Sequence, residues 1–373
     1  MNYTGLDLRS TLTSGGTVQL DLLEVTLSPP GPHEVIVRVE AAPINPSDLG
    51  LLLGPAKLST MTTGGTAERP VLTADVYAKA MVGMTARLDQ SMPVGNEGAG
   101  TVVQAGDNVT ELLGRKVGMI GGGMYTQFRK LAARDCIALP DGASAADGAS
   151  MFVNPLTALA FTETMRAQGH TAIVHTAAAS NLGQMLAKIC LADSIPLVNI
   201  VRSAKQADIL RAIGATVILD STNVDFDIQL TDAIAETGAT IAFDAIGGGT
   251  LAAQILHAME VAASRNAQAY SRYGSSTFKQ VYIYGALDTK PTVVDRSFGF
   301  SWSLSGWLLT PFLEKAGLES MLRMRQRISD ELRSTFASHY SATISLCDAL
   351  KPEIVEAYQR KTTGEKYLIN PSL

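Results

Sequence analysis

The sequence of 373 residues predicts an α/β protein of two domains, because the spacing of its apolar residues changes once along the chain. Up to about residue 150, short apolar runs are separated by turns, which is typical of a barrel-like β domain. Beyond about residue 171, short apolar runs alternate with segments of helical length, which is typical of a doubly wound parallel sheet. We expect the β domain to cover 1–152 plus 331–373, and the α/β domain to cover 153–330.

The strands of the β domain follow from period-two patterns. Val35, Val37 and Val39 alternate with Ile36, Arg38 and Glu40, as in a half-buried strand. Further β-rich runs cover 100–104, 116–120 and 125–131. The tail ends in a helix pattern over 353–360 and a strand pattern over 366–369, which we expect to pack back on this domain.

The strands of the α/β domain are predicted from five apolar runs. These runs are 172–176, 196–201, 216–219, 240–244 and 281–284. Between the first two, Leu182, Met185, Leu186 and Ile189 fall at i, i+3, i+4 and i+7, which predicts one buried face of a helix.

The composition of the chain bears on which partners and which cellular compartment we expect. Its formal net charge of -5 gives no electrostatic reason to expect nucleic acid or an anionic membrane. Cys136, Cys190 and Cys347 are far apart and odd in number, which indicates a reducing, cytoplasmic compartment rather than a disulfide framework. The uncharged run 297–313 is marginal in length for a membrane span, and we expect it to form a sheet edge or a subunit contact.

The turn after the first α/β strand is the predicted phosphate site. A dinucleotide-binding fold places a glycine-rich turn here, so that backbone N–H groups at a helix N-terminus meet the pyrophosphate. In this chain Ala177 and Ser180 stand at two glycine positions and only Gly183 remains. A turn of small residues chosen for close helix–strand packing is the alternative interpretation. The predicted cofactor-binding residues of the turn are Ala178, Ala179, Ser180, Asn181, Leu182 and Gly183.

The end of the next strand favours NADPH over NADH. A NAD-binding fold needs an acidic side chain there for the ribose hydroxyls. This strand instead ends in Arg202, 19 positions after Gly183, and Lys205 follows. A planar guanidinium suits a 2′-phosphate, although a solvated pair at the start of a helix is the alternative.

Two later turns are expected to border the cofactor. Phe243–Gly249 is a strand end running into three glycines, and Tyr284 with Gly285 ends the next strand. Because ligands of open α/β sheets lie beyond the carboxyl ends of the strands, we expect Gly247, Gly248, Tyr284 and Gly285 at the cofactor.

Five segments carry a family resemblance. They are Ile44–Asp48 (INPSD), Gly95–Gly98 (GNEG), Asn154–Ala158 (NPLTA), Asn199–Arg202 (NIVR) and Thr363–Lys366 (TGEK). With them, the chain from about residue 17 to 370 resembles the medium-chain dehydrogenase/reductase superfamily, in its zinc-independent branch of quinone oxidoreductases and 2-enoyl thioester reductases. The resemblance implies a GroES-like β-barrel catalytic domain, a Rossmann domain, NADPH and a small-molecule substrate. It also implies a homodimer joined at sheet edges, for which 298–309 is the candidate contact.

Zinc is not expected. The zinc-binding relatives use Cys, His and Cys, and the matching positions here hold Asn45, Asn96 and Val153, which supply neither thiolate nor imidazole. Hydride addition to an already polarised acceptor, such as an enone, a quinone or an enoyl thioester, remains open to such a site.

Asn45 and Thr157 are the predicted pocket residues, and Thr157 is also predicted to contact the cofactor. Each motif has a structural alternative, because Asn45-Pro46 and Asn154-Pro155 both look like a helix cap followed by a proline at the first helical position. Asn96 and Glu97 are open to a purely structural role in the β domain.

One departure from the resemblance concerns the proton donor. The thioester reductases carry a catalytic tyrosine a few residues beyond the NPSD motif, where this chain has Ala56. An insertion within 55–93 follows, and we expect it to cover the active-site mouth and Tyr77 to supply a hydroxyl. Alternatively, the period-two pattern through Ala74–Ala80 makes Tyr77 a packing residue on a short strand. The missing tyrosine also leaves open a dinucleotide-binding structural or regulatory protein without turnover.

Overall fold

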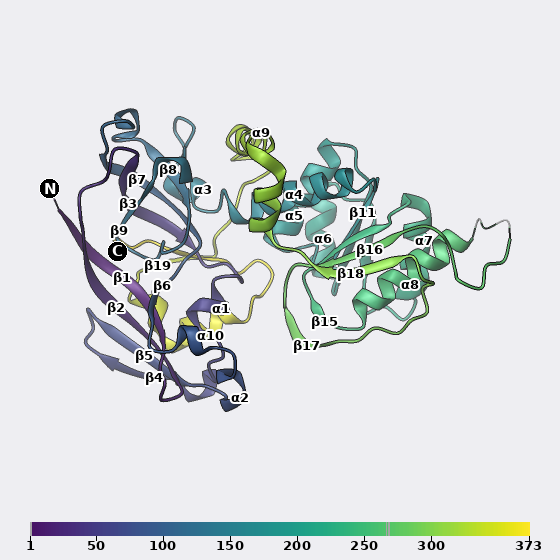
Figure 1. Cartoon of the computed structure of the whole chain (residues 1–373), viewed down its shortest axis with the longest axis horizontal. Coiled ribbons are helices and arrows are strands. Elements are labelled where there is room, and N and C mark those ends of the chain that lie inside the picture. Colours follow the sequence, from purple (N-terminus) through teal and green to yellow (C-terminus); the bar gives the residue numbers. More distant parts are fainter. Residues whose placement is uncertain (1, 266, 268) are drawn as a thin grey trace. The chain divides into compact units, whose positions relative to one another are not determined.

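The computed structural model describes residues 2–265, 267 and 269–373 (Figure 1). The chain divides into two compact units. Unit 1 comprises the residues up to Val153 together with Arg325–Leu373, and unit 2 comprises Asn154–Met324. The sequence analysis expected the chain to return to the first domain at residue 331, and in the structure unit 2 ends at Met324.

Unit 1 is built from two sheets whose strands pair antiparallel, except for the parallel pair β19 and β20. One sheet has the strand order β4-β5-β2-β1-β6, and the other has the order β10-β8-β7-β3-β20-β19 with β9 paired to β3. The strands are β1 (Tyr3–Leu12), β2 (Thr17–Leu27), β3 (Glu34–Pro43), β4 (Thr62–Gly65), β5 (Pro70–Asp75), β6 (Ser91–Pro93), β7 (Glu97–Ala105), β8 (Lys116–Ile120), β9 (Phe128–Ala132), β10 (Cys136–Ala138), β19 (Ala342–Ile344) and β20 (Tyr367–Ile369). Short helices α1 (Leu49–Leu52), α2 (Ala78–Met81), α3 (Ala145–Gly148) and α10 (Pro352–Gln359) complete the unit.

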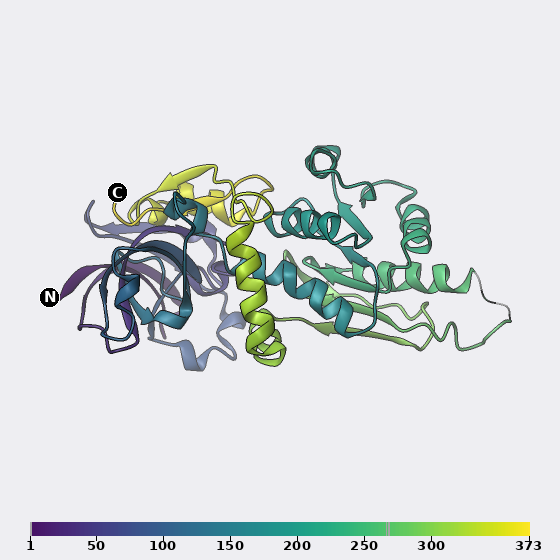
Figure 2. The same cartoon turned by 90° about the horizontal axis from the view of Figure 1, so that it is seen from above.

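The C-terminal tail belongs to this unit. Strand β20 pairs antiparallel with β3, and Leu368 lies opposite Pro43. Figure 2 shows the tail, in yellow, beside the strands of unit 1. The pairing brings Lys366, which directly precedes β20, to the end of β3.

The insertion within 55–93 extends the first sheet. Strand β5 pairs with β2, and β4 pairs with β5 at the sheet edge. The expected strand through Tyr77 is wrong, because β5 ends at Asp75 and Tyr77 directly precedes α2. Asp75 lies opposite Thr17, the first residue of β2, so the ladder has no further partner for Tyr77.

Unit 2 contains a six-stranded parallel sheet in the order β13-β12-β11-β14-β16-β18. Its strands are β11 (Ile173–His175), β12 (Leu197–Val201), β13 (Ile218–Asp220), β14 (Ile241–Asp244), β16 (Lys279–Ile283) and β18 (Trp302–Gly306). Strands β15 (Gly247–Gly249) and β17 (Asp288–Thr292) form a separate parallel pair. The strand order reverses at β11, which is the topological switch point of a Rossmann domain. The predicted fold class is confirmed.

Helices cover both faces of this sheet. They are α4 (Val153–Ala167), α5 (Asn181–Ala192), α6 (Ala204–Ile213), α7 (Phe226–Thr237) and α8 (Leu251–Ser264). Helix α9 (Leu309–Asp330), which has a non-helical break at Gly317, begins in unit 2 and ends in unit 1. On one face, residues of α7 and α8 form a core with Ala242 and Val281. On the other face, the Phe161 ring of α4 stacks on Phe243 with 3.9 Å between centroids. Successive side chains of β14 thus pack against helices on opposite faces of the sheet, as is typical of a buried parallel strand.

The uncharged run 297–313 forms the sheet edge. It contains β18, which pairs with β16 and ends the strand order, and it continues into the start of α9. No helix among the described residues is both long enough and apolar enough to cross a membrane.

Candidate cofactor site and buried polar cluster

The turn after β11 has the backbone shape of a glycine-rich turn without the glycines. Ala177 has φ +49°, in the left-handed region that glycine prefers. The following N–H, of Ala178, donates to the carbonyl of Ile200 at the end of β12 at 3.1 Å. Ala177 therefore takes the conformation of the glycine it replaces, at a cost of about 1–2 kcal/mol for a residue with a Cβ.

Ser180 and Gly183 stand at the other two glycine positions of this turn. Ser180 is the N-cap of α5, and its Oγ accepts the N–H of Gly183 at 3.1 Å. A Cβ on Gly183 would lie 2.2 Å from the carbonyl oxygen of Ala178, so only glycine allows the helix to approach the strand this closely. The one glycine that remains is thus the one required by packing.

Arg202 and Lys205 stand at the carboxyl end of β12. Ser203 caps α6 by accepting the N–H of Gln206, and both basic side chains are exposed on either side of this cap. The backbone N–H of Arg202 donates to the Gln206 side chain at 3.0 Å. Among the residues that the structure describes, neither basic side chain forms a salt bridge, so both charges are available to an anion.

The predicted glycines at the ends of β14 and β16 pack against each other. A Cβ on Gly247 would lie 2.8 Å from the carbonyl oxygen of Gly285, and one on Gly285 would lie 2.6 Å from that of Ala245. A Cβ on Gly248 would lie 2.7 Å from the carbonyl oxygen of Lys290. These glycines therefore allow two backbone segments to touch at the carboxyl edge of the sheet.

Asp244 organises this edge, and the sequence analysis assigned it no role. Its carboxylate is 1% exposed and accepts hydrogen bonds from the Thr176 hydroxyl at 2.7 Å and from the N–H groups of Ile246 and Gly247 at 2.9 and 3.0 Å. It thereby ties the end of β11 to the turn after β14. The feature of the sequence that could have indicated this role is an acidic residue at the end of an otherwise apolar strand.

Tyr284 and Thr157 lie in the interior of unit 2. The Tyr284 hydroxyl is hydrogen-bonded to His175, and burial raises the pKa of Tyr284 above its ordinary value. Thr157 lies in α4 and is 6% exposed. The helix-cap interpretation of Asn154 is wrong, because α4 begins one residue earlier, at Val153, whose N–H donates to the Glu97 carboxylate at 2.9 Å.

In unit 1, Asn45 belongs to a buried polar cluster rather than to a helix cap. Its Nδ2 donates to Oε1 of Glu97 at 2.8 Å. Its backbone N–H donates to Oδ2 of Asp48 at 2.7 Å. The helix that follows, α1, has Asp48 as its N-cap, so the cap interpretation of Asn45 is wrong. All three side chains are at most 2% exposed.

Glu97 is the acceptor at the centre of this cluster. Its Oε2 accepts the N–H groups of Phe152 and Val153, both at 2.9 Å, while Oε1 accepts from Asn45. Burial raises the pKa of Glu97, and the cation of Lys366 and the three donors act against that rise.

Asp48 joins two loops of unit 1. Besides Asn45, its carboxylate accepts the backbone N–H of Asn96 at 2.8 Å. Burial raises the pKa of Asp48 to about 7, although these hydrogen bonds oppose the rise. The Asn96 carboxamide turns away and donates to Ser47 at 3.0 Å.

Lys366, the last residue of the TGEK motif, completes the cluster. Its Nζ donates to the Ser150 hydroxyl at 2.7 Å and lies 5.6 Å from the centre of the Tyr340 ring. Burial lowers the pKa of Lys366 to about 8, and the charges of Glu97 and Asp48 act against that fall. Sequence reasoning used this motif only for the resemblance and did not assign Lys366 a partner.

The described residues contain no group of three or more His, Cys, Asp and Glu side chains arranged to hold a metal ion. At the positions that match the zinc ligands of relatives, the carboxamides of Asn45 and Asn96 are hydrogen-bonded to Glu97 and Ser47.

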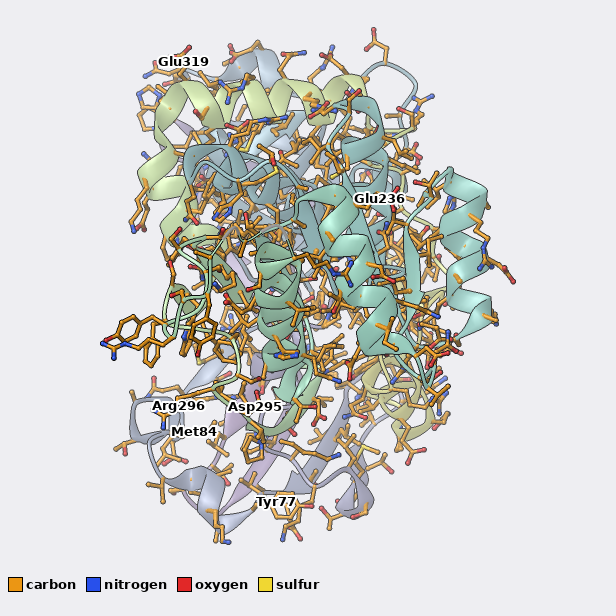
Figure 3. The ribbon with its side chains drawn as sticks, turned by 90° about the vertical axis from the view of Figure 1, so that its right-hand side faces the viewer. Tyr77, Met84, Glu236, Asp295, Arg296 and Glu319 are labelled. Carbon is orange, nitrogen blue, oxygen red and sulfur yellow. The ribbon has the colours of Figure 1, made fainter. Side chains whose placement is uncertain are left out.

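Tyr77 lies at the outer surface of unit 1, where Figure 3 labels it. Its side chain is 58% exposed, and the Lys57 ammonium lies 4.8 Å from its ring centre. Ala56, which stands where the thioester reductases carry tyrosine, forms an isolated β-bridge with Val76. Tyr77 thus follows directly on the residue paired with Ala56.

Comparison with known proteins identifies one domain of the chain and several similar proteins. Residues 31–141 match the alcohol dehydrogenase GroES-like domain. A mitochondrial enoyl-[acyl-carrier-protein] reductase of Xenopus tropicalis is 31% identical over 189 residues, which cover 49% of this chain and 45% of that protein. The chain therefore matches less than two thirds of this relative.

Solved structures share the whole fold. A protein described as an NADPH:quinone reductase from Mesorhizobium loti superposes with a TM-score of 0.72 at 24% identity, covering 99% of this chain and 98% of that chain. Etr1p in complex with NADP and crotonyl-CoA superposes with a TM-score of 0.67 at 20% identity, covering 99% of this chain and 100% of that chain. The motifs, the matched domain and the two-unit fold agree: this chain contains an alcohol dehydrogenase GroES-like domain and is similar to quinone and enoyl reductases of the medium-chain dehydrogenase/reductase superfamily.

Proposed function

We propose that this protein is an NADPH-dependent oxidoreductase that reduces an activated C=C bond, in an enone or enoyl thioester, or a quinone, without zinc. The observation that carries the proposal is Arg202, exposed and without a carboxylate partner in the described structure, at the strand end where a NAD-binding fold has an acid. The relatives named above include an NADPH:quinone reductase and a complex with NADP and crotonyl-CoA, and they supply the acceptor classes.

The residues of unit 2 fit this cofactor. Residues 178–180 end the turn before α5 and residues 181–183 begin the helix, where backbone N–H groups and the helix dipole favour a pyrophosphate. Arg202 and Lys205 would bind the 2′-phosphate, and Gly247, Tyr284 and Gly285 would border the cofactor at the carboxyl edge of the sheet. NADPH supplies the hydride when it is bound.

The side chains of this chain must then orient the acceptor and provide a proton. Asn45 and Thr157 are proposed as pocket residues, with Thr157 also at the cofactor. Tyr77 is proposed as the proton donor, because it follows the residue paired with Ala56 and because a phenol hydroxyl is a hydrogen-bond donor. The insertion that carries Tyr77 would cover the mouth of the site.

Carboxamides in place of zinc ligands support a reaction without a metal Lewis acid. The absorbance of NADPH, followed with a quinone, an enone and an enoyl thioester, tests the reaction. We expect NADPH to be consumed with at least one acceptor, without loss of rate after treatment with a chelator and without stoichiometric zinc in elemental analysis. NADPH binding without oxidation by any acceptor would instead support the dinucleotide-binding structural or regulatory protein.

We also propose a cytoplasmic homodimer joined through the edge strand β18. The segment 298–309 around this strand exposes large apolar side chains, with Phe300 78% and Leu308 66% exposed. Unpaired backbone groups of an edge strand are a template for a second strand. Light scattering on the purified protein should give twice the chain mass, and a charged residue at Phe300 should lower it to the monomer mass.

A further inference from the structure

We propose that Glu97 and Lys366 are positioning residues, which hold the carboxamide of Asn45 so that its oxygen, rather than its nitrogen, is presented to a bound ligand. The inference rests on the proposed function, because that function places Asn45 in the pocket. It adds the chemical character of the contact: the ligand group that meets Asn45 is a hydrogen-bond donor, such as a hydroxyl or an amide N–H.

Only one of the two polar atoms of the Asn45 carboxamide forms a hydrogen bond within the described chain. It is 2% exposed, and its Nδ2 donates to Oε1 of Glu97 at 2.8 Å. Its Oδ1 is buried and has no hydrogen-bond partner within the described chain. A buried carbonyl oxygen without a donor is unfavourable, so a ligand that donates to it recovers that lost hydrogen bond.

The charge of Glu97 decides which end of Asn45 is used. Two backbone N–H groups, of Phe152 and Val153, donate to Oε2, and backbone N–H groups cannot reverse their role. Only Oε1 can change from a hydrogen-bond acceptor to a donor. While Glu97 is ionised, Oε1 accepts and must face the Asn45 amide nitrogen. A proton on Oε1 would make it a donor, and the Asn45 carboxamide would then turn its oxygen toward Glu97.

Lys366 keeps Glu97 ionised. Burial favours the neutral acid, and the Lys366 cation is the largest influence that opposes it. Ser150 anchors the ammonium at 2.7 Å and itself shares a hydrogen bond of 2.9 Å with Tyr340. The other titratable groups that act on Glu97 or on its neighbours in the cluster are Asp48, Tyr125, Asp147, Tyr340 and Tyr358. Lys366 is the cation among them.

This arrangement separates two tasks in the proposed reaction. An oxygen of Asn45 cannot stabilise an enolate, because both are acceptors. Asn45 therefore orients a donor group of the cofactor or substrate, and the donor to the developing enolate is a different residue.

Three variants separate positioning from structural support. Glu97→Gln keeps the shape but provides an NH₂ group that can donate to Asn45 Oδ1, and it removes one of the two negative charges, of Glu97 and Asp48, that favour the buried Lys366 cation. Adding Lys366→Met removes that cation. The matched control is Glu260→Gln in unit 2, because Glu260 is 7% exposed and forms a buried ion pair of 2.6 Å with Lys279.

The expected results differ between the variants. Glu97→Gln should lower both Tm and kcat/KM, the latter by at least about tenfold. The double variant should regain Tm but not kcat/KM. Glu260→Gln should lower Tm and change kcat/KM by less than about twofold. Recovery of both Tm and kcat/KM in the double variant would overturn the proposal.

A measurement without turnover separates this proposal from the proposed function. In protein labelled with ¹⁵N-asparagine, the Asn45 side-chain amide signals are identified by their loss in Asn45→Ala. They should shift in Glu97→Gln and stay in place in Glu260→Gln. If no acceptor is reduced but these signals shift, the reaction fails and the orientation holds. Unshifted signals contradict the orientation, whatever the activity.

Discussion

Nε2 of His175 lies 2.8 Å from the hydroxyl oxygen of Tyr284, and the two rings are stacked at 13° with 5.8 Å between their centres. The pair connects the end of β11 to the residue after β16, across the intervening strand β14. His175 is 0% exposed, and its Nδ1 has no hydrogen-bond partner in the described chain. A protonated His175 would therefore be a buried cation beside a neutral phenol.

This pair predicts an acid-sensitive fold. Burial lowers the pKa of His175 to about 3, below its ordinary value of 6.5. A depressed pKa gives stability that is fully present above about pH 6.5 and is lost as the pH falls toward 3, because the unfolded chain binds the proton first. As the pH falls from about 6 to 4, His175 should lower the free energy of unfolding by about 1.4 kcal/mol for each pH unit.

Urea unfolding of wild type and His175→Phe at several pH values measures this effect as a difference. The difference matters because Asp48, whose pKa is raised to about 7, has the opposite sign: its stability contribution is lost as the pH rises through 7. His339→Phe, at an exposed position, is the control and should keep the wild-type slope. Equal slopes in wild type and His175→Phe would show that His175 is not the group responsible.

Arg202→Ala should reduce the preference for NADPH. Loss of a charged hydrogen bond to the 2′-phosphate costs about 1.5–3 kcal/mol, so the ratio of kcat/KM for NADPH to that for NADH should fall about ten- to a hundredfold. Arg211→Ala, on the helix α6 that follows Arg202 and paired with Asp208 at 2.6 Å, is the control. An unchanged ratio in Arg202→Ala would remove the argument for NADPH.

Gly183→Ala should disrupt the turn at α5. The added Cβ would lie 2.2 Å from a backbone oxygen, so helix and strand must separate. We expect unfolding to become easier by about 1–3 kcal/mol and NADPH affinity to fall, as measured by urea unfolding and fluorescence titration. Gly50→Ala, where a Cβ meets nothing within 4 Å, is the control. Wild-type stability and affinity in Gly183→Ala would contradict the close packing.

Tyr77→Phe tests the proton donor, because it removes the hydroxyl and keeps the ring. If Tyr77 donates the proton to the enolate, kcat with an enone acceptor should fall at least about tenfold, or about 1.4 kcal/mol. The ring contact with Lys57 is retained in the variant. Steady-state kinetics that leave kcat within about twofold would assign Tyr77 to packing alone.

The sequence by itself determined the features that depend on neighbouring residues or on residue identity. Apolar periodicity located the strands of the parallel sheet and the buried face of α5, since each depends on residues only a few positions apart. The turn between β11 and α5, which we propose as the phosphate site, was located from the same change of pattern. The absence of thiolate and imidazole at Asn45, Asn96 and Val153 needed no coordinates at all.

Only the tertiary structure decided which distant side chains meet. Asn45 and Glu97 are 52 positions apart, Ser150 and Lys366 are 216 apart, and His175 and Tyr284 are 109 apart. Each pair depends on the pairing of strands that are remote in the chain, which local periodicity does not encode. The same long-range contacts explain the incorrect helix-cap predictions: the Asn45 side chain binds Glu97, and Val153, the first residue of α4, donates its N–H to the same carboxylate. A buried polar side chain takes the partner that the fold brings to it, because leaving it unpaired away from water costs more than leaving a local motif unused.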